Sequence, residues 1–164
     1  MSKIKRIFLI VLVTIGLTSC DVLQQMSQMA NFAKCTFDFN SVNSVEMLGL
    51  NLRKGMTRSD LNVNQAIALT RALVNKSLPV TFNVNLDVTN PNSSPASMTK
   101  MDYILTLNDK RVIATTLDQT ISVPANASNT VTIPVSTDLL QLFSGESADA
   151  IVNLAFKLAG ASSD

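Results

Sequence analysis

The stretch "VTFNVNLDVTNPN" runs from Val80 to Asn92 and decides the fold. Apolar and polar side chains alternate from Val80 to Thr89, a period of two that predicts a half-buried strand of an antiparallel sheet. Pro91 has no amide hydrogen and pushes Asn90 toward an extended conformation, so it ends the strand. Asn92 and the serines after it bond to their own backbone and favour a tight loop. We therefore interpret Asn90, Pro91 and Asn92 as a structural turn in preference to a ligand site.

Alternating strands recur on both sides of this stretch. The segment from Cys35 to Leu50 predicts one long or two short strands, with Gly49 permitting a bend. Asn108 and Asp109 can form a tight hairpin turn, although less readily than Asn-Gly. Short links between the strands are typical of an antiparallel sandwich. The predicted fold is therefore mainly β, and its later strands cover 101–107, 111–117, 121–123 and 131–135.

Helical patterns interrupt and follow these strands. A first amphipathic helix is predicted to begin at Ser59 or Asp60 and to end before Pro79. Its apolar positions are Val63, Ala66, Ile67, Leu73 and Val74. A second helix is predicted from a Ser147 cap to Gly160, and it is apolar enough that we expect it to be buried. Its single polar stripe consists of Asp149, Asn153 and Lys157.

The amino terminus has the pattern of an export signal. Basic residues precede an apolar run, Ile7 to Leu17, that is too short to span a membrane comfortably. Leu17, Thr18, Ser19 and Cys20 resemble the lipobox of bacterial lipoproteins, which implies cleavage of 1–19 and acylation of the Cys20 sulfur. Two or three acyl chains anchor a protein stably. The alternative is a free cysteine near an ordinary cleavage site.

A short tether, 20–34, is expected to follow the lipid. Leu23, Met26, Met29 or Ala30, and Ala33 have helical spacing. We interpret them as an apolar stripe that packs against the domain or against the membrane surface, in preference to a metal site.

Composition excludes several classes of function. Processing would leave ten Lys and Arg against twelve Asp and Glu, so no basic surface for nucleic acid is expected. The chain has no histidine, so Cys-His catalysis is excluded and metal sites built on His or Cys are not expected. Cys35 is interpreted as a buried thiol without a disulfide partner. We expect no cofactor and no metal.

An enzyme built on carboxylates is the remaining catalytic hypothesis. Asp87 and Asp102 lie on strands that could approach one another, but their positions in the alternation point both side chains outward. Exposed acids are usually only solvated, so we expect no enzymatic activity. A pocket with two carboxylates of raised pKa would favour catalysis.

Four features of the sequence form a family pattern: the strand ending in Asn90-Pro91-Asn92, the strand with Tyr103, the hairpin at Asn108-Asp109 and the final "TVTIPV". Together they resemble the late embryogenesis abundant group 2 domain, also called the water stress and hypersensitive response (WHy) domain. The resemblance covers about 35–143. It implies an immunoglobulin-like or fibronectin type III-like sandwich that has no enzymatic activity and is associated with stress tolerance. Bacterial relatives are often lipoproteins, and the composition looks like that of the Bacteroidetes.

One departure from the family concerns the carboxyl-terminal end. Family domains usually continue with closing strands after the helical segment, and none is visible in the sequence. We expect domain 35–164 to be incomplete, through truncation or because a partner supplies the missing edge.

The expected function is that of a non-catalytic, lipid-anchored envelope module that binds or protects other components; the alternative is a structural subunit completed by a partner strand. Its expected partners are the membrane, through the lipid, and an envelope protein; the sequence identifies no small-molecule ligand. We expect it on the periplasmic face of the outer membrane. Asp21 resembles an inner-membrane retention signal, so the inner membrane is the alternative.

Overall fold

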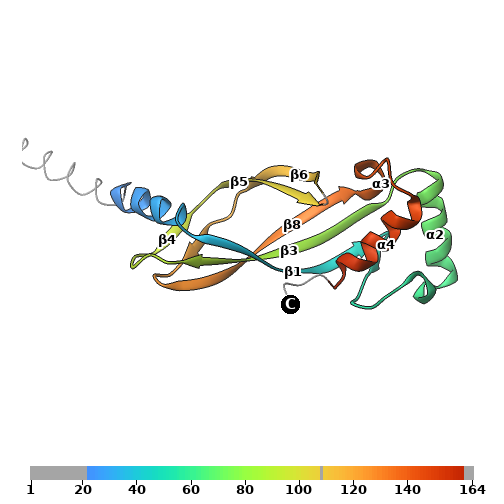
Figure 1. Ribbon diagram of the computed structural model, residues 1–164, viewed down its shortest axis with the longest axis horizontal. Helices are drawn as coiled ribbons and strands as arrows, with labels where there is room; N and C mark the ends of the chain where they lie inside the picture. The colour runs from blue at the N-terminus through green and yellow to red at the C-terminus, as the bar shows by residue number, and fades with distance from the viewer. Residues whose placement is uncertain (1–21, 108, 161–164) are drawn as a thin grey trace, which may run out of the picture. The chain divides into compact units, whose positions relative to one another are not determined.

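The computed structural model describes residues 22–107 and 109–160 (Figure 1). The predicted signal segment 1–19 and Cys20 lie outside the described residues. The chain is mixed α/β, and its sheets are antiparallel as the alternation predicted. None of the helices among the described residues has both the length and the apolar character needed to cross a membrane.

The largest sheet has the strand order β2-β1-β3-β8 (Figure 1). Its strands are β1 (Thr36–Met47), β2 (Leu50–Asn51), β3 (Pro79–Asn90) and β8 (Ala127–Asp138). The stretch that decides the fold is thus an inner strand, flanked by β1 and β8. One side of β3 is buried through the alternating residues predicted for it, namely Val80, Phe82, Val84 and Val88.

The other side of β3 carries polar side chains that join it to both neighbouring strands. Asn85 donates to the Ser41 hydroxyl at 3.0 Å and accepts from the Thr132 hydroxyl at 2.9 Å. Alternation therefore sets which face of β3 is buried, and the polar positions of the opposite face connect β3 to β1 and β8.

Two smaller antiparallel pairs complete the strands among the described residues. β5 (Met101–Leu107) pairs with β6 (Lys110–Leu117) as the predicted hairpin, and Asp109 takes the left-handed φ of 60° that its turn requires. β4 (Ala96–Met98) pairs with β7 (Ile121–Val123). The sequence prediction missed β4 because Pro95 and the serines around it are typical of a loop.

The described residues form two compact units. Unit 1 comprises 22–36, 89–99 and 120–129, and its core contains Phe32, Cys35, Asn90, Ala96, Ile121 and Val123. Unit 2 comprises 37–88, 100–119 and 130–160, and it contains the helices after residue 36.

The first helix of unit 2 differs from its prediction at its start and in its buried face. A short 3-10 turn, η1 (Arg58–Asp60), precedes α2 (Val63–Val74), and Asn62 caps α2 by accepting from the Gln65 amide. The predicted caps Ser59 and Asp60 were wrong: both lie in the 3-10 turn, where the Asp60 carboxylate accepts from the Thr57 amide, and the capping box of Asn62 and Gln65 starts α2. Leu69 and Ala72 are buried, whereas the predicted apolar positions Val63, Ile67 and Val74 are exposed.

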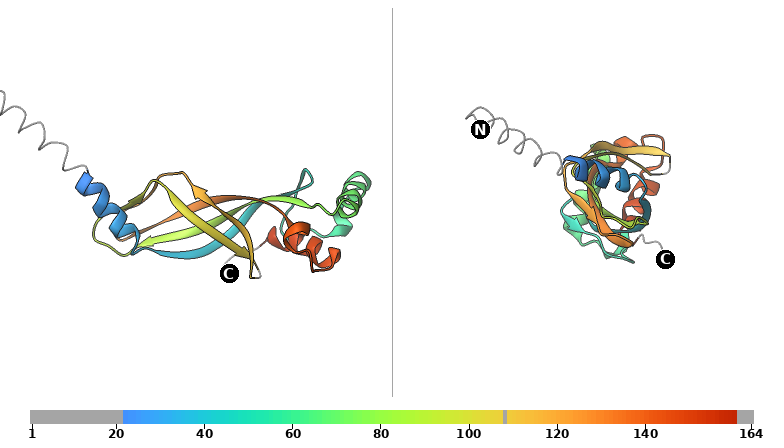
Figure 2. Two further views of the ribbon diagram at one scale, coloured as in Figure 1. Left: turned by 90° about the horizontal axis from the view of Figure 1, so that it is seen from above. Right: turned by 90° about the vertical axis from the view of Figure 1, so that its left-hand side faces the viewer.

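The last helices agree with the sequence. α3 (Leu139–Leu142) and α4 (Ala148–Leu158) follow β8, and Figure 2 shows them, in red, at the same end of unit 2 as α2, in green. Ser147 caps α4 as predicted, by accepting from the Ala150 amide at 3.2 Å. The predicted burial of α4 is confirmed for Ile151, Val152, Ala155, Phe156 and Leu158.

Candidate functional site

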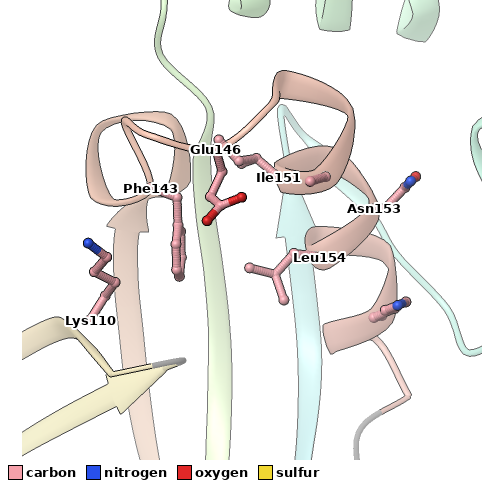
Figure 3. Close-up of a pocket in the computed structure, with 8 residues that line it drawn as sticks. Lys110, Phe143, Glu146, Ile151, Asn153 and Leu154 are labelled. Carbon is pink, nitrogen blue, oxygen red and sulfur yellow. The ribbon is translucent and has the colours of Figure 1, made fainter.

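The candidate site is a cleft beside α4 in unit 2, with a volume of about 490 Å³. Phe143 and Ile151 are buried in its floor, and Leu154 is half-buried. Figure 3 shows Phe143 at the end of α3 and Leu154 on α4 on opposite sides of the carboxylate of Glu146. The loop between α3 and α4 therefore brings apolar side chains from both helices together.

Charged side chains surround this apolar floor. Lys110 comes from the start of β6, Glu146 from the loop before α4, and Lys157 from the last turn of α4. All three are exposed. An apolar floor surrounded by exposed charged side chains suits an apolar group of a partner.

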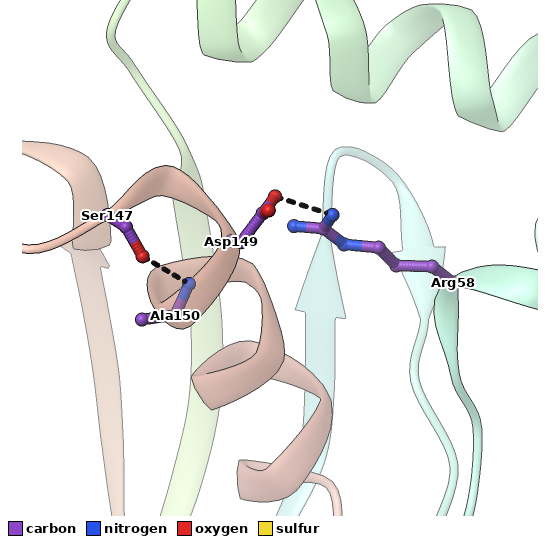
Figure 4. Close-up of polar contacts among 4 residues, drawn as sticks. All are labelled: Arg58, Ser147, Asp149 and Ala150. Atoms are coloured by element: carbon purple, nitrogen blue, oxygen red, sulfur yellow. Dashed lines mark hydrogen bonds and ion pairs between the residues drawn. The ribbon is translucent and has the colours of Figure 1, made fainter.

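A second cleft of about 490 Å³ shares Asn153 and Lys157 with the first. Arg58 lines it, and its Nη1 donates to Asp149 at 2.8 Å (Figure 4). The Nε and Nη2 atoms of the same guanidinium are buried and have no hydrogen-bond partner among the described residues. Buried donors without partners destabilise a fold, and a small movement of Arg58 would make these two donors available to a ligand.

The two candidate carboxylates, Asp87 and Asp102, accept hydrogen bonds from different partners. Asp87 accepts from Asn40 at 2.8 Å and from Thr130 at 2.6 Å, and these hydrogen bonds lower the pKa of its carboxyl. Asp102 accepts from the Thr116 hydroxyl at 2.6 Å on the β5–β6 hairpin. A lowered pKa is opposite to what a general acid needs near neutral pH.

The turn residue Asn90 lies at the centre of unit 1 and is fully buried. Its side-chain amide donates to the carbonyl oxygens of Ser94, Val123 and Pro124 at 3.0 to 3.2 Å. Its side-chain oxygen accepts from the amide of Asn92 at 3.0 Å. Asn90 thus ties the end of β3 to the end of β7, as expected of a structural turn.

Asn92 extends this turn to the amino-terminal helix, residues 22–32. Its side-chain nitrogen donates to the Asn31 carbonyl at 3.0 Å, and the Asn31 side chain donates to the Pro95 carbonyl at 3.1 Å. The sequence did not predict this connection, because the two segments are about sixty residues apart. The only signal for it was the polar character of Asn31 and Asn92.

Cys35 lies directly before β1 and is buried, as predicted for a structural thiol. Burial raises the pKa of its thiol, and its sulfur donates a weak hydrogen bond to the Asn31 carbonyl at 3.6 Å. A raised pKa disfavours the reactive thiolate.

Asp138 is a further polar residue that sequence reasoning missed. Burial alone would raise its pKa, but the Ser77 hydroxyl and the amides of Leu78, Gln141 and Leu140 donate to its carboxylate and lower the pKa overall. It caps α3 and fixes the chain before β3 to the end of β8. The signal was its position just before a short helical pattern.

The cleft residues Phe143, Glu146 and Lys110 were not predicted as a site, since the sequence places them on separate segments with no shared motif. Among the described residues no group of three or more Cys, Asp and Glu side chains forms a candidate metal site.

Comparison with known proteins supports the resemblance seen in the sequence. No curated protein and no solved structure matches the chain. The family model of the late embryogenesis abundant protein matches residues 85–161, from the middle of β3 through α4. The match includes α4, which lies beyond the 35–143 covered by the resemblance noted from the sequence. Residues 85–161 therefore form a late embryogenesis abundant domain of the group 2, or WHy, type.

Proposed function

We propose that the chain is a non-catalytic, lipid-anchored module of the cell envelope that binds and protects other envelope components. The domain over 85–161 supports a stress-related protective role. It also supports the absence of catalysis, because proteins of this family are generally non-catalytic. The cleft beside α4 carries the binding part of the proposal. Its floor of Phe143, Ile151 and Leu154 opens to solvent between charged side chains and suits an apolar group of a partner.

A drying experiment tests the protective role. A drying-sensitive enzyme is dried and rehydrated with the purified chain, and recovered activity is measured. We expect recovery to fall with Leu154→Gln, which places an amide in the cleft, and to be unchanged with Val74→Gln, an exposed apolar residue of α2. Equal protection by both variants would exclude the cleft, and recovery no better than with an unrelated protein would contradict the protective role.

Anchoring is tested on the chain isolated from its native envelope. We propose that Cys20 carries the lipid and that the domain faces the periplasm from the outer membrane. Mass spectrometry of the amino-terminal peptide should show an acylated Cys20, and Cys20→Ser should release the protein from membranes. Separation of the two membranes then decides between the outer membrane and the inner-membrane alternative. An unmodified Cys20 in membrane-bound protein would contradict the anchor.

A second candidate is a structural subunit whose sandwich is completed by a partner strand, and the edge of β1 favours it. β2 pairs with β1 only at Glu46 and Met47, so residues 36–44 have β3 as their single strand neighbour among the described residues. An unpaired edge of this length accepts an extended peptide. Peptides from co-purifying proteins should protect the amides of 37–44 from hydrogen exchange. Unchanged exchange with every such peptide would exclude this candidate.

A further inference from the structure

The apolar side chains of the helix of residues 22–32 are exposed and are not packed against unit 1. Val22, Leu23, Met26 and Met29 are 54 to 65% exposed. The sequence left open whether this stripe packs against the domain or against a membrane. The exposure excludes packing against unit 1, the unit to which the helix belongs.

The stripe is a continuous face. Residues 22, 26, 29 and 33 follow one another at spacings of three and four, so they line one side of the helix, with Leu23 and Ala30 beside them. Gln24, Gln28 and Asn31 lie on the opposite side. Gln24 is exposed as well, whereas Gln28 and Asn31 are half-buried, so only the last part of the polar side lies against unit 1.

The polar side is the one that holds the helix to unit 1. Asn31 bonds to Asn92 and to Pro95, and the adjacent Phe32 is 2% exposed. This attachment fixes the end of the helix, so its apolar face keeps its direction relative to unit 1.

The chemistry of the face selects among possible occupants. Residues 22–33 contain no ionisable side chain, so the face has no charge to pair with a charged partner. Four large exposed side chains are far fewer than the roughly 20 to 30 residues a side of a stable protein interface. A short apolar face of this kind suits the boundary between lipid headgroups and acyl chains.

We propose that the face formed by Val22, Leu23, Met26 and Met29 lies in the surface of the membrane that anchors the chain. The inference rests on the proposed lipid anchor, because the described part of the helix starts at Val22, two residues after Cys20 in the sequence. The acyl chains bring the face to the bilayer, and the face then sets how unit 1 is oriented on it. The turn Asn90-Pro91-Asn92 thereby acquires a second role, since Asn92 holds the helix in this orientation.

An environment-sensitive fluorophore on the helix tests the proposal. Met26→Cys and Gln24→Cys, each combined with Cys35→Ser, are labelled with a nitrobenzoxadiazole probe in the acylated protein and reconstituted in phosphatidylcholine vesicles. We expect a blue shift and a several-fold increase in emission at position 26 and aqueous emission at position 24. Aqueous emission at both positions, with an acylated Cys20, would overturn the proposal and leave the anchor intact.

The same chain without acylation, beginning at Asp21, separates the two proposals. Added to the same vesicles, its probe at position 26 should shift as lipid concentration rises, whereas the probe at position 24 should not. An unacylated Cys20 in the native envelope would overturn the anchor but not this measurement. A shift at position 26 that depends on protein concentration without vesicles would show a second copy on the face and overturn the membrane proposal.

Discussion

The amino-terminal helix and α4 are both amphipathic, but they direct their apolar faces in opposite ways. In α4 the apolar residues Ile151, Val152 and Phe156 are buried and Asp149 is exposed. In the helix of 22–32 Met26 is 63% exposed. Periodicity therefore identifies a helix and its apolar face, but the available partner decides what that face contacts.

The largest change in stability is expected when a buried apolar side chain of α4 is truncated, whereas the same change on the apolar face of 22–32 should have little effect. Phe156→Ala should destabilise the protein by about 3 to 5 kcal/mol, because it leaves a cavity at a buried site. Met26→Ala in the unacylated chain should change the free energy of unfolding by less than about 0.5 kcal/mol. Urea denaturation measures both. Similar losses in the two variants would show that the apolar face of 22–32 is covered by the protein itself.

The next effect concerns the polar attachment of the amino-terminal helix. Asn90→Ala should cost about 2 to 3 kcal/mol, since it leaves buried carbonyl groups in unit 1 without their donor. Asn92→Ala removes the bond to Asn31 and should chiefly increase hydrogen exchange in 22–32. Unchanged exchange there in Asn92→Ala would mean that buried Phe32 and the bond from Asn31 to the Pro95 carbonyl are sufficient to hold the helix.

The same contrast explains how much the sequence predicted. Strict alternation identified β3, because each buried position such as Phe82 is set by the pleat alone. Cap chemistry identified Ser147 at the start of α4. The buried face of α2 was not predictable, since apolar residues surround most of that helix and only tertiary contacts select Leu69 and Ala72. The cleft was not predictable either, because Lys110 and Leu154 meet only through the fold.

A smaller effect on stability is expected from acid at Asp138, which caps α3. The pKa of Asp138 is lowered in the folded protein, so its contribution is present above its unfolded pKa of about 3.9 and is lost as pH falls through the folded value. Asp138→Ala should cost about 1 kcal/mol at neutral pH and flatten the loss of stability below pH ~4. Denaturation midpoints measured across this range provide the test. Residues 22–33 cannot titrate, so hydrogen exchange there should not follow this transition.

The smallest expected effect lies on the polar stripe of α4. Asp149 pairs with Arg58 at 2.8 Å but is 78% exposed, so the pair should contribute only about 0.2 to 1 kcal/mol. A double-mutant cycle of Asp149→Asn and Arg58→Gln measures this coupling by urea denaturation. Because Nε and Nη2 of Arg58 are buried without partners among the described residues, Arg58→Gln alone should cost little stability. A coupling well above 1 kcal/mol would show that the exposed face of α4, unlike the polar side of 22–32, is held by charge.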